Sequence, residues 1–130
     1  MADRNFGNQF HSNVWAPIEI CVSWVIGAAG AVGVVRGNKV TSVVGGGGTG
    51  IYTITLDDRY NQLYNANGMI AAISGAAEDL YVQVSAYVVG PAATGATVII
   101  KCMTGAVETD PAATDEVFVK LVFSNSSLDP

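Results

Sequence analysis

The feature that most constrains this chain is a strict alternation of apolar residues over positions 17–26. The alternate positions are Ile18, Ile20, Val22, Trp24 and Ile26. Successive side chains of an extended strand point to opposite faces, so this spacing predicts a long strand with one fully apolar face. We expect that face, including Trp24, to lie in a hydrophobic core.

The same period of two recurs along the rest of the chain. Further strands are predicted at 31–35, 39–44, 51–56, 69–74, 80–89, 97–103 and 116–123. Clusters of Gly, Pro, Asn and Asp separate them, and Arg36-Gly37-Asn38 predicts a hairpin turn. Positions 57–67 are polar and rich in turn formers, and no stretch forms a convincing amphipathic helix. About eight short strands with regular turns indicate an all-β antiparallel β-sandwich or jelly-roll.

A chain of 130 residues is the size of one ordinary domain. Residues 1–14 are polar and lack periodicity, so we expect an extended N-terminal arm followed by a single β-sandwich domain over 15–130. The N-terminus lacks the apolar core of a signal peptide, and the longest apolar run, 21–35, is interrupted by Ser23 and by glycines. We therefore expect neither secretion nor a membrane partner.

Charge is scarce in this sequence. Hydrophobic residues make up 50% and charged residues 13%, against about 25% charged in ordinary domains. A small monomer needs a charged surface to stay soluble, so we expect part of the outside to be buried in a homo-oligomer. The alternative is a surface covered by Ala, Gly, Thr and Ser. The net charge of −5 and only six scattered cations argue against a nucleic-acid partner.

A glycine-rich segment matches one cofactor fingerprint by spacing alone. Gly45, Gly47 and Gly50 fit G-x-G-x-x-G, which in dinucleotide-binding folds leads into a helix N-terminus. Here the alternating strand 51–56 follows, and no acidic residue lies at 67–70, about 20 positions on. We expect no cofactor and interpret the segment as a hairpin tip.

The residues for catalysis or metal binding are few. His11 is the only histidine and lies in the arm, so we expect no catalytic residues and no enzyme. Asp57 and Asp58 could contribute to a calcium site, although their spacing is not that of an EF-hand. Cys21 and Cys102 could form one disulfide, but we expect both to be reduced and buried.

The arm and its junction carry aromatic residues that local structure does not bury. Aromatic side chains are favoured anchors at protein interfaces. We expect Phe6, Phe10 and Trp15, together with His11, to form a protein interface on a neighbouring subunit. The alternative is that the arm folds back over its own sandwich.

Two segments resemble small β-sandwich modules of bacteriophage virion proteins. The first is Thr41-Ser42-Val43-Val44 followed by 48–56, Gly-Thr-Gly-Ile-Tyr-Thr-Ile-Thr-Leu, similar to "S-V-x…G-T-G-x-Y-T-V-x-F". The second is 114–123, Thr-Asp-Glu-Val-Phe-Val-Lys-Leu-Val-Phe, similar to "T-D-x-x-F-x-V-x-V". Together they cover about a fifth of the chain, and they transfer no individual site residue.

The resemblance implies a role in a virion. Such modules occur as capsid decoration (cement) proteins and as tail-fibre head domains, generally as trimers. A fibre protein normally adds an attachment domain and a shaft, so we expect a decoration protein that binds the major capsid protein on the outer capsid surface as a homotrimer and stabilises the shell. It would be made in the host cytoplasm. The alternative is a tail module that binds a receptor or carbohydrate through loops such as Tyr60–Asn67.

Overall fold

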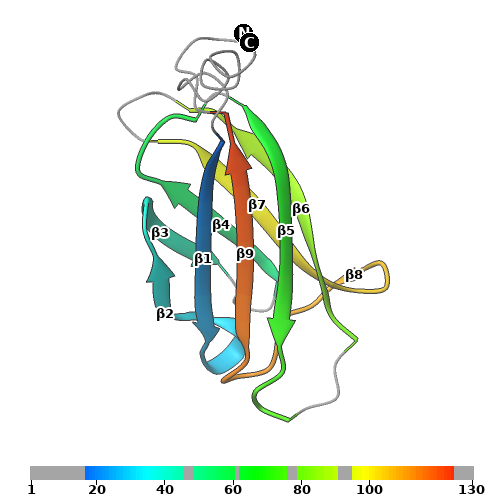
Figure 1. Ribbon diagram of the computed structural model, residues 1–130. Helices are drawn as coiled ribbons and strands as arrows, with labels where there is room; N and C mark the ends of the chain where they lie inside the picture. The colour runs from blue at the N-terminus through cyan, green and yellow to red at the C-terminus, as the bar shows by residue number, and fades with distance from the viewer. Residues whose placement is uncertain (1–16, 46–48, 61, 76–78, 91–94, 125–130) are drawn as a thin grey trace, which may run out of the picture.

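The computed structural model describes residues 17–45, 49–60, 62–75, 79–90 and 95–124 and shows two antiparallel sheets packed face to face (Figure 1). This confirms the predicted all-β sandwich. The strands are β1 (Ile18–Ile26), β2 (Val32–Gly37), β3 (Val40–Gly45), β4 (Ile51–Leu56), β5 (Leu63–Ala71), β6 (Tyr81–Val88), β7 (Thr97–Thr104), β8 (Val107–Glu108) and β9 (Glu116–Phe123).

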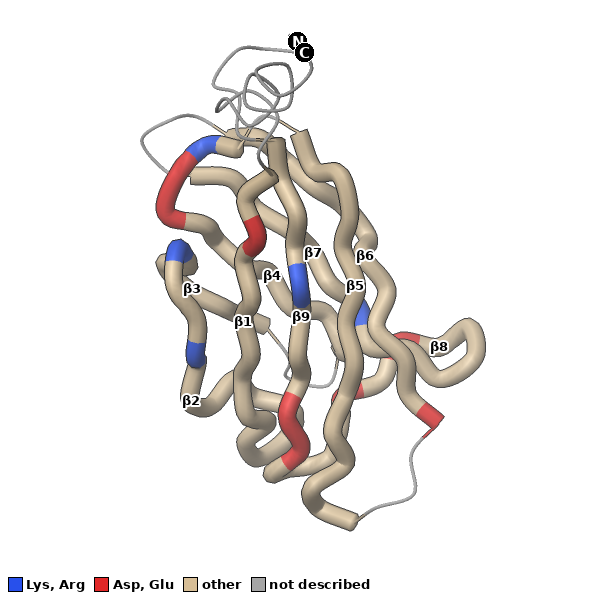
Figure 2. The backbone as a smooth tube through the Cα atoms, viewed as in Figure 1, with Lys and Arg blue, Asp and Glu red and all other residues tan. Residues whose placement is uncertain are grey.

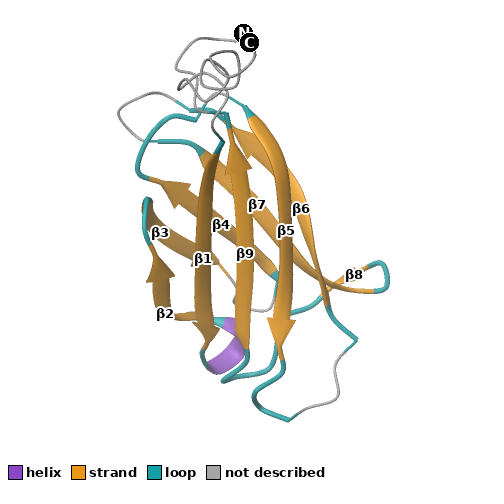
Figure 3. Cartoon of the chain, in the orientation of Figure 1, coloured by secondary structure: helices purple, strands orange, loops and turns teal. Residues whose placement is uncertain are grey.

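The chain combines hairpins within each sheet with crossings between the two sheets. Sheet A has the order β2-β1-β9-β5, and sheet B has the order β3-β4-β7-β6, with β8 added to β7. The first and last long strands, β1 and β9, pair over eight residues at the centre of sheet A. At one edge β5 packs beside β6, and at the other β2 packs beside β3. Within the described ranges the one helical element is the short 3-10 turn Ala28–Gly30 (Figure 3). No helix there is long and apolar enough to span a membrane.

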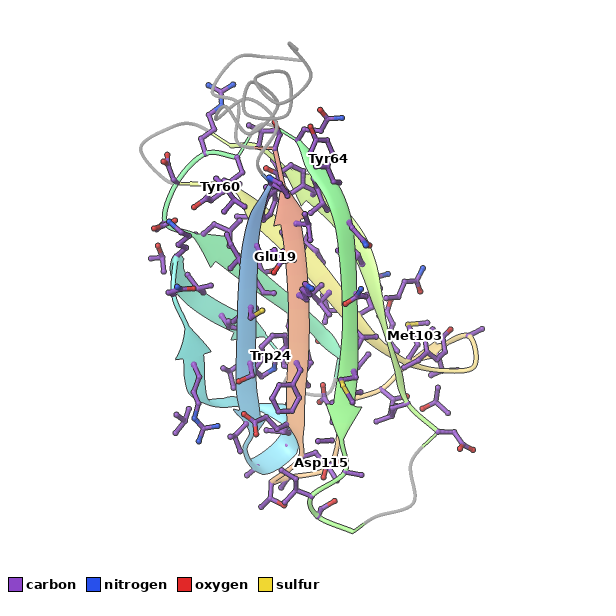
Figure 4. All side chains as sticks on the ribbon, viewed as in Figure 1. Glu19, Trp24, Tyr60, Tyr64, Met103 and Asp115 are labelled. Carbon is purple, nitrogen blue, oxygen red and sulfur yellow. The ribbon has the colours of Figure 1, made fainter. Side chains whose placement is uncertain are left out.

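The core lies between the sheets and is built from the alternate positions of the strands. The apolar face of β1 is buried as predicted, with Trp24 completely inaccessible and its ring 5.4 Å from that of Tyr52 on β4. Tyr60 stacks on Phe123 at the upper end of the sandwich (Figure 4). The other fully buried large apolar side chains are Ile20, Ile26, Ile54, Leu56, Val98, Ile100, Val117 and Leu121.

The predicted hairpin around Arg36-Gly37-Asn38 is wrong. The flanking strands do form, but β2 pairs with β1 in sheet A and β3 pairs with β4 in sheet B. The turn therefore carries the chain from one layer to the other. Gly37 has a φ of +148°, and a Cβ there would lie 2.7 Å from the carbonyl oxygen of Cys21. A glycine at this position lets the chain leave sheet A close to β1.

Two further predictions need correction. The predicted connection over 57–67 ends earlier than expected and the strand predicted at 69–74 is displaced, because β5 runs over Leu63–Ala71. The period of two predicted for the strand at 80–89 is interrupted, because the β6–β7 register shifts between Val84 and Ala86. After this bulge Tyr87, rather than Ala86 or Val88, packs against the core, with its ring 5.5 Å from Phe123.

Candidate functional site

The outer face of sheet B is almost free of charge. Lys101 is the only charged residue of β3, β4, β7 and β6, all four of which are fully described. Figure 2 shows long uncharged stretches of tube, with charges mainly on connections and on sheet A. The register aligns outward rows such as Val44–Thr53–Ile99–Ala86 and Ser42–Thr55–Thr97–Val88. We call these two rows, with Ile51 and Tyr81, the sheet B face.

The sheet B face leaves large apolar side chains in solvent. Val44 is 64% exposed and Val88 52% exposed, at opposite edges of the sheet. The Lys101 ammonium is neutralised by Glu108 on β8, 2.6 Å away. An apolar, neutral surface of this kind is typical of a face that packs against other protein.

The outer face of sheet A is different, because it is hollowed and carries charge. The hollow has a volume of about 520 Å³. One side is the row Arg36–Ser23–Phe118–Met69, which runs across all four strands, and the other is the row Cys21–Lys120–Asn67. We call the space between these two rows the sheet A hollow. Cys21 and Ser23 on β1 contribute small side chains to its lining, and Phe118 and Met69 contribute larger ones.

An ion-pair network fixes one end of the sheet A hollow. Nη1 of Arg36 donates to Oε1 of Glu116 at 2.7 Å, and the Ser23 hydroxyl donates to the same oxygen at 3.1 Å. The Glu116 side chain is 11% exposed and that of Arg36 62% exposed. The second pair, Lys120–Glu19 at 3.2 Å, is well exposed at both ends. The lining of the hollow is thus mostly apolar and locally neutral, with one guanidinium held in place.

A second polar cluster, at the lower end of the sandwich, joins three segments. The Tyr52 hydroxyl donates to the Gly30 carbonyl oxygen at 2.9 Å and to Oδ1 of Asp110 at 3.4 Å. The Gly50 amide donates to the same Asp110 oxygen at 2.7 Å. A Cβ on Gly30 would clash with the Asp110 carboxylate. The cluster therefore holds loops against the core, and its polar groups are engaged with each other.

Burial raises the pKa of three tyrosines above the ordinary range. For Tyr52 the nearby Asp110 carboxylate adds to the effect of burial on the pKa. For Tyr60 burial and the hydrogen bond to Asp57 both raise the pKa. For Tyr87 burial raises the pKa and the Arg59 cation partly opposes this shift. Because all three rings pack in the core, these shifts reflect packing rather than a reactive site.

The residues predicted for the interface, Phe6, Phe10, His11 and Trp15, lie outside the described residues, and so does the predicted arm. The two cysteines are both free, as expected. The expectation that both are buried is wrong for Cys21, which is exposed on the outer side of sheet A, whereas Cys102 is in the core. Cys21 alternates with the inward residues of β1, so its apolar neighbours in sequence face the other way.

The other candidates from the sequence, the glycine-rich segment and the pair Asp57 and Asp58, have structural roles in the residues described. A strand, β4, follows Gly50, so the glycine segment leads into no helix. Asp57 accepts a hydrogen bond from Tyr60 and Asp58 one from the Arg59 amide. Among the described residues no group of three or more His, Cys, Asp or Glu side chains is placed to hold a metal ion.

Most of the segment proposed as a receptor-site loop is a strand. Tyr60 is buried, and Leu63–Asn67 belong to β5. Cys21 was considered as a thiol and Asn67 as part of the segment 60–67, but sequence reasoning did not bring together the residues that line the sheet A hollow. They come from four strands, and only the register brings Arg36 beside Ser23 and Phe118 beside Met69.

Comparisons of the chain with protein-family models, with curated proteins and with solved structures found no match. The resemblance to phage virion modules therefore stays a prediction.

Proposed function

We propose that this protein is a non-enzymatic structural module that assembles with copies of itself through the sheet B face. In its specific form, the proposal is a capsid decoration protein that binds the outer surface of a virion as a homotrimer and stabilises it. The sheet B face carries the proposal of self-assembly. The capsid as partner and the trimer are supported by the sequence resemblance.

The chemistry of the sheet B face favours another copy as its partner. A surface with one internally neutralised cation gains little from a charged partner, whereas an apolar, threonine-rich face of another copy matches it. Strand rise and spacing give this four-stranded face a planar footprint of about 400–500 Å². A stable interface buries about 800 Å² per partner. Val107 on β8, which is 64% exposed, extends the apolar area beyond that footprint.

Stabilisation of a capsid would follow from linkage. A ligand that binds only the assembled shell stabilises the shell, and three linked copies bind with greater avidity than one. The predicted arm with Phe6, Phe10 and His11, together with Trp15 at its junction, is our candidate for the capsid contact.

Two measurements test this function separately. Light scattering after size exclusion should give the mass of a trimer at micromolar concentration, and a clean monomer would contradict self-assembly. Capsids should resist heating better with the protein than without it. Deleting residues 1–14 should abolish capsid binding but not trimer formation. If binding survives the deletion, the arm is not the contact.

The second candidate is a receptor- or carbohydrate-binding tail module. The sheet A hollow favours it, because Phe118 lies there with the Asn67 amide and two cationic side chains. Two results together would support this candidate over the first. The protein would bind a glycan array saturably and lose this binding on Phe118→Ala, and it would have no effect on capsid stability.

A further inference from the structure

We propose that the sheet A hollow binds a small organic anion with an apolar body, such as an aryl or alkyl carboxylate. The hollow lies on the opposite layer from the sheet B face, so this site is independent of self-assembly. Its volume of about 520 Å³ is within the range of about 300–1,000 Å³ typical of small-molecule sites.

The apolar part of the lining fits an apolar body. Phe118 and Met69 pair across β9 and β5, and both remain exposed although they are large apolar side chains. The exposed thiol of Cys21 lies on β1, on the other side of β9 from β5. An aromatic or alkyl group here would cover the Phe118 ring and the Met69 thioether, which favour such contacts. A purely polar ligand, such as free phosphate, would leave this surface in water.

The rim supplies one prearranged cation for the anionic group. The buried Glu116 carboxylate holds Arg36 through Nη1 only, and Ser23 donates to the same carboxylate oxygen. A guanidinium has five N–H donors, and the Arg36 side chain is 62% exposed. Its remaining donors can therefore bind a carboxylate while the side chain keeps its position. Lys120, which pairs with exposed Glu19, is less constrained.

Matched ligands test the site in the wild-type protein. The fluorescent probe 1-anilinonaphthalene-8-sulfonate should bind the folded protein with a stoichiometry of one per chain. Phenylbutyrate should displace it at least about tenfold more strongly than the neutral phenylbutanol, because one charge-assisted hydrogen bond is worth about that factor. Saturating phenylbutyrate should also slow alkylation of Cys21 by iodoacetamide. Equal displacement by the acid and the alcohol, or an unchanged alkylation rate, would overturn the proposal.

Variants test which residues contact the apolar body of the ligand and which bind its anionic group. Cys21→Trp fills the hollow and should abolish probe binding. Arg36→Gln should reduce the preference for the acid to less than about twofold, whereas Arg36→Lys should keep most of it. Lys101→Gln is the matched control, since it also removes a paired cation, but on sheet B, and it should leave probe binding and the preference for the acid unchanged. Probe binding that survives Cys21→Trp, or a preference lost equally in Lys101→Gln, would contradict the site. If Arg36→Gln does not fold, the comparison of phenylbutyrate with phenylbutanol in the wild-type protein and probe binding by Cys21→Trp still test the site.

Discussion

Arg36 on the edge strand β2 and Glu116 at the start of β9 form a 2.7 Å ion pair across β1, which lies between their strands. Ser23 on β1 completes the bridge by donating to the same carboxylate oxygen. Three strands of sheet A are thus joined by side chains as well as by the backbone ladder. Because the carboxylate is nearly buried, its two partners replace the water that it loses on folding.

Removing Arg36 should therefore cost more than removing an exposed partner. We expect Arg36→Ala to lower the free energy of unfolding by about 1–2 kcal/mol, since it leaves a nearly buried carboxylate with one donor fewer. Lys120→Ala, which breaks the exposed pair with Glu19, should cost less than about 0.5 kcal/mol. Urea unfolding of both variants measures the difference. Equal costs would show that burial of Glu116 does not strengthen its pair.

Alkaline pH should destabilise the fold. Burial raises the pKa of Tyr52, Tyr60 and Tyr87 above the ordinary value of about 10. Above pH 10 the unfolded chain loses protons that the folded chain retains, so the stability from these groups is complete below pH 10 and falls as the pH rises further. Urea midpoints between pH 8 and 12 should decrease above pH 10. Tyr52→Phe should make that decrease shallower, and an unchanged slope would contradict its contribution.

The strands that sequence predicted best are those buried on one face only. In β1, β4 and β9 every second residue is a large apolar side chain that packs between the sheets. Burial on one side of a strand imposes a period of two, and that period is visible without any partner.

The sequence-based predictions were wrong where the structure of a segment depends on the strand that packs or pairs with it. In β5 the inward positions include Ala66 and Gly68, because β6 packs so close that a Cβ on Gly68 would lie 2.8 Å from Val82. The inward face is therefore not marked by bulky apolar residues, and the polar outward residues Asn65 and Asn67 resemble a turn. Likewise, the turn at 36–38 has ordinary hairpin chemistry, but sheet partners far along the chain separate β2 from β3. The sheet A hollow depends on the same long-range register, so no local motif reveals it.

The two thiols should differ in reactivity. Cys21 is exposed and Cys102 is completely buried. We expect one thiol per chain to react with a neutral alkylating reagent in the native protein and two after denaturation in urea. Intact mass measurement counts the adducts. Cys21→Ser should abolish the native reaction and Cys102→Ser should leave it unchanged. Two fast-reacting thiols in the folded protein would contradict the burial of Cys102.

Charges placed on the sheet B face should prevent self-assembly without unfolding the chain. Val44 and Val88 are more than half exposed, so replacing either by Lys disturbs little of the core. In an assembled interface the same lysine would be buried without a partner, which costs several kcal/mol and shifts the equilibrium to the monomer. Val34→Lys on β2 is the matched control, since Val34 is equally exposed but lies in sheet A.

Sedimentation velocity at several concentrations distinguishes the outcomes of these substitutions. Val44→Lys and Val88→Lys should sediment as monomers with unchanged circular dichroism, and Val34→Lys should assemble like the wild type. Loss of assembly in Val34→Lys alone would place the interface at the β2 edge, where apolar side chains and the free backbone of an edge strand are also exposed. Assembly in all three would exclude both surfaces, leaving the arm with Phe6, Phe10 and Trp15 as the contact between copies.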